Sequence, residues 1–223
     1  MSGTDEMSLP PTIFRFRIQY AKKETLRYTG NLDIHKIWER SFRRAKLSLA
    51  YSQGFNKQPR LNQALPLPLG FTSQAELIDF WLEEWFSPDD LYQKLILALP
   101  TGISILSIQP VDIHEPALQN RVIETEYLVS FIQPIPLLIL KEKITNIMAQ
   151  PVLFRVRRQK EYNLRPLIKD IFSLVVTEDG LPSFCTRLTA QPNATGRPDE
   201  VVAALGFEPY LARYERTKII LSD

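Results

Sequence analysis

Cysteine and histidine are scarce in this chain. Its 223 residues include one cysteine, Cys185, and two histidines, His35 and His114. A single cysteine cannot form an intrachain disulfide, and so few ligands argue against a zinc site of cysteines and histidines or an iron–sulfur cluster held by several thiolates. We therefore expect neither a metal ion nor a cofactor in this chain.

Long apolar runs are missing as well. No stretch approaches the roughly 20 apolar residues that a membrane-spanning helix needs, and the first residues, MSGTDEMSLPP, lack the pattern of a secretory signal. We expect no membrane contact, a cytoplasmic location and a disordered lead over residues 1–11. The sequence also contains no Walker loop, no GxGxxG and no serine–histidine–acid set, so nothing in it demands that the chain be an enzyme.

The charge of the chain is distributed unevenly, although its net value is only +2. Residues 31–60 contain seven Lys/Arg against two Asp/Glu, and residues 151–169 contain six against one, which gives +5 in each window and leaves −8 for the remaining residues. Concentrated positive windows that also carry tyrosine or phenylalanine favour a polyanion, RNA in particular, as the ligand. The alternative is that both windows are solvated surfaces.

A helix is predicted from about Leu32 to Leu47, with Asn31 as its N-cap and Asp33 in its first turn. At roughly 100° per residue, its apolar side chains gather on one side and its cations on the other. The apolar side consists of Ile34, Ile37, Trp38, Ser41, Phe42 and Ala45. The opposite side carries Lys36, Arg40 and Arg43, with Arg44 next to them. This basic side is either a phosphate-binding surface or a solvated helix face.

The helix is followed by a loop, YSQGFNKQPR, over residues 51–60. The loop combines neutral hydrogen-bonding groups, cations and flat rings, which are the groups that proteins use to bind single-stranded RNA. We assign these roles to Ser52, Gln53 and Asn56, to Lys57 and Arg60, and to Tyr51 and Phe55, respectively. The alternative is that Tyr51 and Phe55 are anchors in the hydrophobic core.

Three motifs of this stretch resemble one protein family. They are DxxxxWERxxRRAxL from Asp33, YSQGFN from Tyr51 and LPLPLG from Leu65, and with the rest of the chain they resemble the radical SAM-linked protein family, a domain of unknown function. The resemblance implies a partner, a radical SAM enzyme encoded beside the domain or fused to it, which would carry S-adenosylmethionine, an iron–sulfur cluster and cobalamin. Where the family has Ser-His-Leu-Asp, this chain has GNLD over residues 30–33, so Asp33 matches and the family's serine and histidine do not.

The pattern of elements predicts an α+β fold of two tandem ferredoxin-like (βαββαβ) units with mainly antiparallel sheets. The first unit spans residues 12–115 and the second spans residues 116–223. In the first unit, strands are expected at residues 12–20, 60–69, 77–85 and 103–113, with a second helix at 88–99. In the second unit, strands are expected at residues 122–132, 152–158, 172–177, 181–190 and 210–221, with helices at 134–149 and 196–206.

The first expected strand alternates between apolar and polar residues. Phe14, Phe16, Ile18 and Tyr20 share one face, and Arg15, Arg17 and Gln19 share the other. We expect a half-buried strand, with only the apolar face in the core.

A second basic run, RVRRQKEYNLRP, covers residues 155–166. As a strand it would hold Arg155 and Arg157 on one face and Arg158 on the other, with Arg165 further along the chain. We assign these four arginines to RNA binding; the alternative is an edge strand that its charges protect from aggregation. Cys185, inside an apolar strand, is expected to be buried and inert.

Three functions fit these features. The leading hypothesis is a non-catalytic module that binds RNA or another substrate and presents it to the radical SAM partner, in RNA or ribosome-related modification. The second is an RNA-modifying enzyme in which Asp33 acts as in pseudouridine synthases, which rests on fold analogy, since Asp33 is otherwise a helix-start charge. The third is a protein–protein adaptor whose basic surfaces dock on an acidic partner.

Overall fold

The computed structural model describes residues 13–157 and 159–222 of the chain. The lead predicted over residues 1–11 and the predicted RNA-binding residue Arg158 lie outside this part. The first half forms β1 (Phe14–Lys22), α1 (Asn31–Arg44), β2 (Leu61–Gln63), β3 (Thr72–Leu82), α2 (Pro88–Ile96) and β4 (Ile103–Val111). The second half forms α3 (Leu118–Arg121), β5 (Val122–Phe131), α4 (Leu137–Ala149), β6 (Phe154–Arg157), β7 (Lys160–Asn163), β8 (Ile168–Val176), β9 (Pro182–Gln191), β10 (Ala194–Thr195), α5 (Pro198–Ala204) and β11 (Ala212–Leu221).

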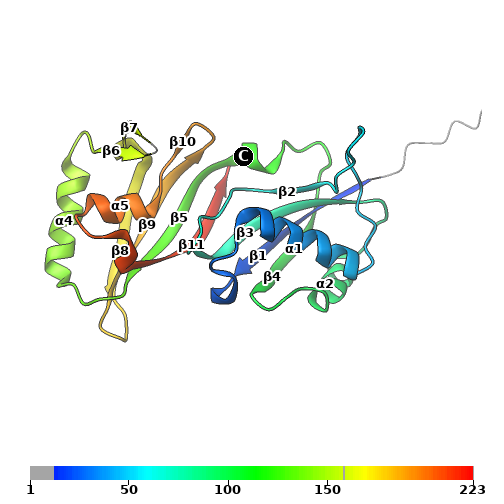
Figure 1. The fold of residues 1–223 in the computed structure, drawn as a ribbon, viewed down its shortest axis with the longest axis horizontal. Helices are drawn as coiled ribbons and strands as arrows, with labels where there is room; N and C mark the ends of the chain where they lie inside the picture. Colours follow the sequence, from blue (N-terminus) through cyan, green and yellow to red (C-terminus); the bar gives the residue numbers. More distant parts are fainter. Residues whose placement is uncertain (1–12, 158, 223) are drawn as a thin grey trace, which may run out of the picture.

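Nine of the described strands form one sheet in the order β10-β9-β5-β11-β3-β1-β4, with β2 beside β3 and β8 beside β9 (Figure 1). The first half follows the order β2-β3-β1-β4 and the second half the equivalent order β8-β9-β5-β11, with every neighbouring pair inside a half antiparallel. The halves join where β11 runs parallel to the start of β3. The predicted α+β class with a mainly antiparallel sheet is therefore confirmed.

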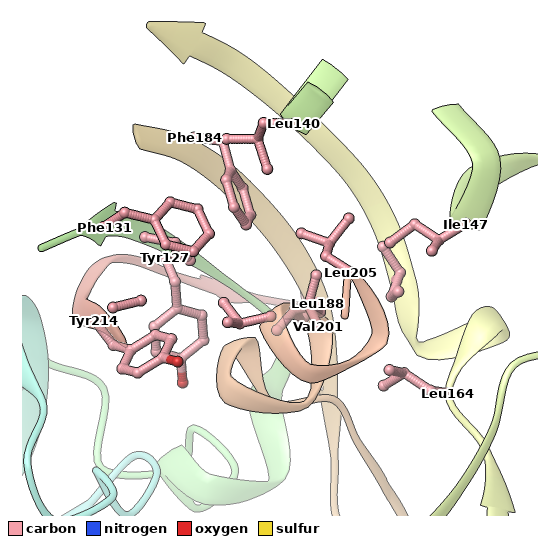
Figure 2. Packing of buried hydrophobic residues seen from close by; sticks show 14 of the residues in the cluster. Tyr127, Phe131, Leu140, Ile147, Leu164, Phe184, Leu188, Val201, Leu205 and Tyr214 are labelled. Atoms are coloured by element: carbon pink, nitrogen blue, oxygen red, sulfur yellow. The ribbon is translucent and has the colours of Figure 1, made fainter. Parts of the chain in front are cut away.

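Each half has its own hydrophobic core between the sheet and its helices. In the first half, Phe42 of α1 lies against Phe80 of β3, with 4.6 Å between the ring centroids. The apolar side predicted for α1 is confirmed, since Ile34, Trp38, Ser41 and Phe42 are buried and Ile37 and Ala45 are half-buried. In the second half, Leu140 of α4 and Val201 of α5 lie in the same cluster as Phe184 of β9 (Figure 2).

The two ends of α1 differ from the prediction. Gly30, and not Asn31, is the N-cap, because its backbone is extended and its carbonyl accepts the Ile34 N–H at 3.0 Å. The helix ends at Arg44 instead of Leu47. Lys46 takes a left-handed conformation with φ of 54°, and the Leu47 N–H then returns to the Phe42 carbonyl at 3.1 Å. This is the geometry of a Schellman stop, for which glycine is the usual residue.

Helix-start and turn signals elsewhere are confirmed. Ser87 caps α2 by accepting the Asp90 N–H on its Oγ at 3.1 Å. Gly180 and Gly206 have φ of 75° and 81° at the β8–β9 turn and after α5, where a residue with a side chain would be strained.

The strand expected over residues 60–69 shrinks to β2. Pro66 and Pro68 have no backbone N–H, so the segment cannot continue a ladder. The carbonyls of Leu65 and Pro66 instead accept hydrogen bonds from Arg216 of β11 at 3.3 and 3.1 Å. The LPLPLG motif therefore lies over the junction of the two halves.

The polar face of β1 corrects the prediction of a half-buried strand. Arg15 and Arg17 are only 3% and 7% exposed. Both bind the fully buried Asp79 of β3, with Arg15 Nη2 at 2.6 Å and Arg17 Nε at 2.7 Å from its carboxylate oxygens. The Arg15 guanidinium also donates to the carbonyls of Glu115 and Pro116 at 2.6 and 3.1 Å. The Asp79 carboxylate compensates the charge of the two buried arginines, so this face of β1 can lie in the interior.

The second basic run forms a hairpin that stands apart from the main sheet. β6 pairs with β7 in a separate two-stranded sheet, whereas the sequence predicted a single strand over residues 152–158. In the part of the chain that the structure describes, no helix has the length and apolar character needed to cross a membrane.

Candidate nucleic-acid interface

The basic side of α1 faces a groove of about 630 Å³, which we call the α1 groove. Lys36, Arg40 and Arg43 follow one another at spacings of four and three residues, so they share one side of the helix. All three are exposed. The rest of the lining comes mainly from the segment after the helix, including Lys46, Tyr51 and Pro59. The structure thus brings together three predicted helix residues and one predicted loop residue.

The cations of the α1 groove are not used in ion pairs inside the fold. Among the described residues, none of Lys36, Arg40, Arg43 and Lys46 lies within 4.0 Å of a carboxylate. Two carboxylates, Glu39 and Glu83, also line the groove, and Glu39 contacts Nε2 of His35 at 3.3 Å instead of the arginines. Four cations against two acids leave the groove positive.

The loop that follows is closed by its own hydrogen bonds. Tyr51 forms a bridge with Pro59, the Ser52 N–H donates to the Gln58 carbonyl at 2.8 Å, and the Gln58 N–H donates to Ser52 Oγ at 3.0 Å. Asn56 Oδ1 accepts from Gln58 Nε2 at 3.0 Å. Ser52 and Asn56, predicted to bind RNA, therefore also shape the loop. Gln53 and Lys57 are exposed at its tip.

The two aromatic rings of the loop are on the surface. Phe55 is fully exposed at the tip, next to Gly54 with φ of 119°, and Tyr51 is 51% exposed at the neck. The alternative in which these rings are core anchors is wrong, because neither is in a buried cluster. Both rings are available for stacking on a base.

Two residues predicted to belong with this surface have other surroundings. Arg60 is half-buried and lies over the indole ring of Trp81, with 4.6 Å between its guanidinium carbon and the ring centroid. Arg44 is exposed but does not line the α1 groove, and its Nη2 donates to Ser41 Oγ at 3.3 Å. The structure therefore separates Arg60 and Arg44 from Lys36, Arg40 and Arg43.

The described arginines of the second basic run, Arg155, Arg157 and Arg165, lie in three environments. Arg155 pairs with Glu200 at 3.2 Å, and Arg165 donates to the carbonyls of Met148 and Ile168 at 3.2 and 3.0 Å, so both are engaged within the fold. Arg157 lines a different groove, between the two halves of the molecule.

Asp33 and Cys185 were considered in the sequence for roles other than RNA binding. Asp33 is exposed in the first turn of α1 and lines neither groove. Cys185 was expected to be buried but is half-buried on β9, because only part of its side chain is covered there. Burial and then the nearby Glu126 carboxylate raise the pKa of its thiol. The described residues contain no group of three His, Cys, Asp or Glu side chains that could hold a metal ion.

Sequence reasoning missed Lys46 and Lys160 as individual site residues, although both contribute to the charge windows. Lys46 comes after the C-cap Ala45, at the left-handed position where glycine is usual, so the sequence carried no glycine signal for this turn. Lys160 was outside the strand predicted over residues 152–158 and lies on the second strand of a hairpin. Their positions depend on backbone turns that the residue pattern did not show.

The chain matches, over residues 15–196, the family model described as an uncharacterized protein conserved in bacteria (DUF2344). The matched range contains the whole α1 groove and the loop after it. No curated protein matches the chain.

Proposed function

The chain belongs to this bacterial protein family, and we propose that it is a non-catalytic module that binds RNA and presents it to a partner enzyme. The observation that carries the proposal is the α1 groove, in which Lys36, Arg40, Arg43 and Lys46 are gathered without internal carboxylate partners among the described residues. Unpaired cations in a groove are what phosphate groups bind.

The loop supports RNA over a generic polyanion. Tyr51 lines the α1 groove, and the loop beyond it carries the exposed ring of Phe55. Cations beside exposed aromatic rings are typical of single-strand binding, in which phosphates are neutralised and bases stack. A protein partner with an acidic surface would use the cations and would leave the Phe55 ring without a role.

Two pairs of like charges on α1 are unfavourable for the stability of the helix, which favours a functional explanation. Lys36 and Arg40 are four residues apart, as are Arg40 and Arg44, and like charges at this spacing destabilise a helix by about 0.2–0.5 kcal/mol per pair. A merely solvated helix face has no reason to keep these repulsions. A negatively charged ligand in the α1 groove offsets the repulsion between Lys36 and Arg40, which both line it.

We propose that the partner is a radical SAM enzyme, encoded beside this domain or fused to it. The support is the resemblance carried by the motifs that begin at Asp33, Tyr51 and Leu65. S-adenosylmethionine, an iron–sulfur cluster and cobalamin would belong to that partner, and the reaction would modify RNA or a ribosome-related substrate. With a single cysteine, this chain lacks the thiolates with which such enzymes hold a cluster.

We further infer that each half is a ferredoxin-like unit. The support is that β2-β3-β1-β4 and β8-β9-β5-β11 are equivalent strand orders, each with one helix after its first strand and one before its last. The second unit differs by the inserted β6–β7 hairpin and by β10.

A filter-binding titration at two salt concentrations tests the RNA proposal. The chain is expected to bind a single-stranded RNA with an affinity that falls steeply with salt. In Arg40→Ala/Arg43→Ala, the slope of log K against log salt concentration is expected to become shallower by about 0.7 for each lost phosphate contact. The matched control is Lys141→Ala/Lys169→Ala, which removes two exposed cations outside the groove.

Two results would contradict the proposal. Undetectable binding at low salt, or binding that does not respond to salt, would leave the adaptor function. A modified nucleoside formed by the chain alone, and lost in Asp33→Asn, would instead support the enzyme. We expect neither, because Asp33 is exposed and lines neither groove.

A further inference from the structure

A second groove, of about 840 Å³, opens where the two halves meet, and we call it the junction groove. Three segments line it: residues 65–68 of the first half, the β6–β7 hairpin, and residues 192–197 between β9 and α5. Figure 1 shows the hairpin and β10 side by side at the upper edge of the second half. The volume is in the range of small-molecule sites, about 300–1,000 Å³.

The base of the junction groove is fixed by Arg216. This residue is fully buried, and its Nη1 binds the Glu76 carboxylate at 2.7 Å while Nε and Nη2 donate to the Tyr127 hydroxyl at 3.2 and 3.1 Å. Burial, the largest single influence, works to lower the pKa of Arg216, but the contributions of Glu76 and Tyr127 together outweigh it, so the pKa is raised and the guanidinium stays charged. With its donors committed to Glu76, Tyr127 and the Leu65 and Pro66 carbonyls, Arg216 serves as a rigid floor.

The β6–β7 hairpin supplies the charge that the floor does not. Directly opposite residues of an antiparallel pair share a face, and Arg157 is opposite Lys160 while Arg155 is opposite Tyr162. The salt bridge from Arg155 to Glu200 at 3.2 Å ties this face to α5. Arg157, Lys160 and Tyr162 consequently line the groove together.

The lining of the junction groove is positive. It contains four cations and no carboxylate. Arg216 is neutralised by Glu76, and Arg197 is held by Asp199 through Nε at 2.8 Å and Nη2 at 2.6 Å. Arg157 and Lys160 have no carboxylate within 4.0 Å in the part of the chain that the structure describes. Two surplus charges therefore face the cavity from the hairpin.

Part of the remaining lining is apolar or flat, and Asn163, Asn193 and Thr195 add neutral polar groups. Leu65, Pro66, Leu67 and Pro68 form one side, and the half-buried ring of Tyr162 lies among the hairpin residues. An inorganic anion would use only the cations and would leave this apolar wall wet. A ligand with a phosphate at one end and a planar body at the other satisfies both parts of the groove.

We propose that the junction groove binds a nucleoside 5′-phosphate, either free or as the first residue of an RNA. Arg157 and Lys160 bind the phosphate, and the base lies against Tyr162 and the proline-containing wall of residues 65–68. The site is separate from the α1 groove, with which it shares no residue, and only its RNA-end form rests on the proposed function.

Isothermal calorimetry on the full chain tests the site with adenosine 5′-monophosphate, adenosine and inorganic phosphate. The monophosphate is expected to bind more tightly than either fragment. Arg157→Ala/Lys160→Ala is expected to weaken it by at least about tenfold, because two charge-assisted contacts are lost. Lys141→Ala/Lys169→Ala, which removes two exposed cations outside the groove, and Arg40→Ala/Arg43→Ala are expected to bind the monophosphate as the parent does.

A second pair of ligands identifies the source of the phosphate. An RNA oligomer is compared with and without a 5′-phosphate; if the proposal holds for an RNA end, the parent prefers the phosphorylated oligomer and Arg157→Ala/Lys160→Ala does not. Lys160→Glu is the second variant, since its side chain is exposed and the change does not threaten folding. The proposal is overturned if the chain binds neither the monophosphate nor the phosphorylated RNA end at millimolar concentration. It is also overturned if every hairpin variant binds these ligands as the parent does.

Discussion

Arg15 and Arg17 of β1 and Arg40 and Arg43 of α1 lie in the same half of the molecule and have opposite surroundings. The first pair is buried against Asp79, which accepts hydrogen bonds from both guanidinium groups. The second pair is exposed, and neither member has a carboxylate within 4.0 Å among the described residues. The same side chain therefore has a structural role at one place and is available to a ligand at the other.

The difference lies in the position of the nearest acid. Asp79 is on β3 directly beside β1, so both arginines reach it across the strand pair. On α1, Glu39 is four residues before Arg43, a spacing that normally supports an ion pair, yet it contacts His35. Arginines whose partners are supplied by the fold stabilise it, and arginines whose partners are missing from the fold point to an external anion.

The largest effect is expected from breaking the buried side of this comparison. Asp79→Asn keeps the shape but leaves the buried Arg15 without a carboxylate and Arg17 with only Glu115, at 3.4 Å. This is expected to lower the free energy of unfolding by about 3–5 kcal/mol. Urea denaturation measures it, and Glu84→Gln, an exposed change, is the control. RNA binding by the folded fraction is expected to be unchanged. A loss below about 1 kcal/mol would mean that the ion-pair network around Asp79 does not stabilise the sheet.

The next effect concerns binding alone. Phe55→Ala removes a fully exposed ring, so the free energy of unfolding is expected to stay within about 0.5 kcal/mol. Affinity for single-stranded RNA is expected to fall by about 1–3 kcal/mol for the lost stacked base, with the salt dependence unchanged. Melting and binding are measured on the same sample. A lowered melting temperature would return Phe55 to a structural role.

The sequence sufficed where one residue type determines the local geometry. The amphipathic α1, the Ser87 cap and the turns at Gly180 and Gly206 follow from side-chain periodicity, capping and positive φ, all of which act over a few residues. The α+β class followed from the order of the elements. The α1 groove was found in part, because Lys36, Arg40 and Arg43 share a side of one helix.

The sequence failed where partners are distant along the chain. The residues near Arg15 in the sequence do not indicate that it pairs with Asp79, which is 64 residues away. Arg216, close to the end of the chain, gave no sign that it binds Leu65 and Pro66, 151 and 150 residues earlier. Both contacts depend on which strands become neighbours. The junction groove forms between the two halves, so it could not be predicted from the sequence for the same reason.

A smaller effect of opposite sign is expected at Lys46. Its left-handed backbone, φ of 54°, is unfavourable for a residue with a side chain. Lys46→Gly is expected to raise the free energy of unfolding by up to about 1 kcal/mol and to weaken RNA binding, because a groove cation is lost. Lys46→Ala is the matched control, since it removes the same charge and keeps the strained backbone. A Gly variant that binds RNA as the parent does would mean that Lys46 does not contact the RNA.

The smallest effect is the difference between two adjacent arginines, and it tests how local the binding is. Arg43 and Arg44 are both exposed in the last turn of α1, so they have the same charge, helix propensity and position relative to the helix dipole. Only Arg43 lines the α1 groove. For RNA binding by Arg43→Ala, the slope of log K against log salt concentration is therefore expected to become shallower by about 0.7. Arg44→Ala is expected to leave this slope unchanged. Both are expected to keep the free energy of unfolding within about 0.5 kcal/mol. Equal losses would mean that RNA is attracted by the diffuse charge of the helix, and a loss confined to Arg43 means that the phosphate sits in the groove.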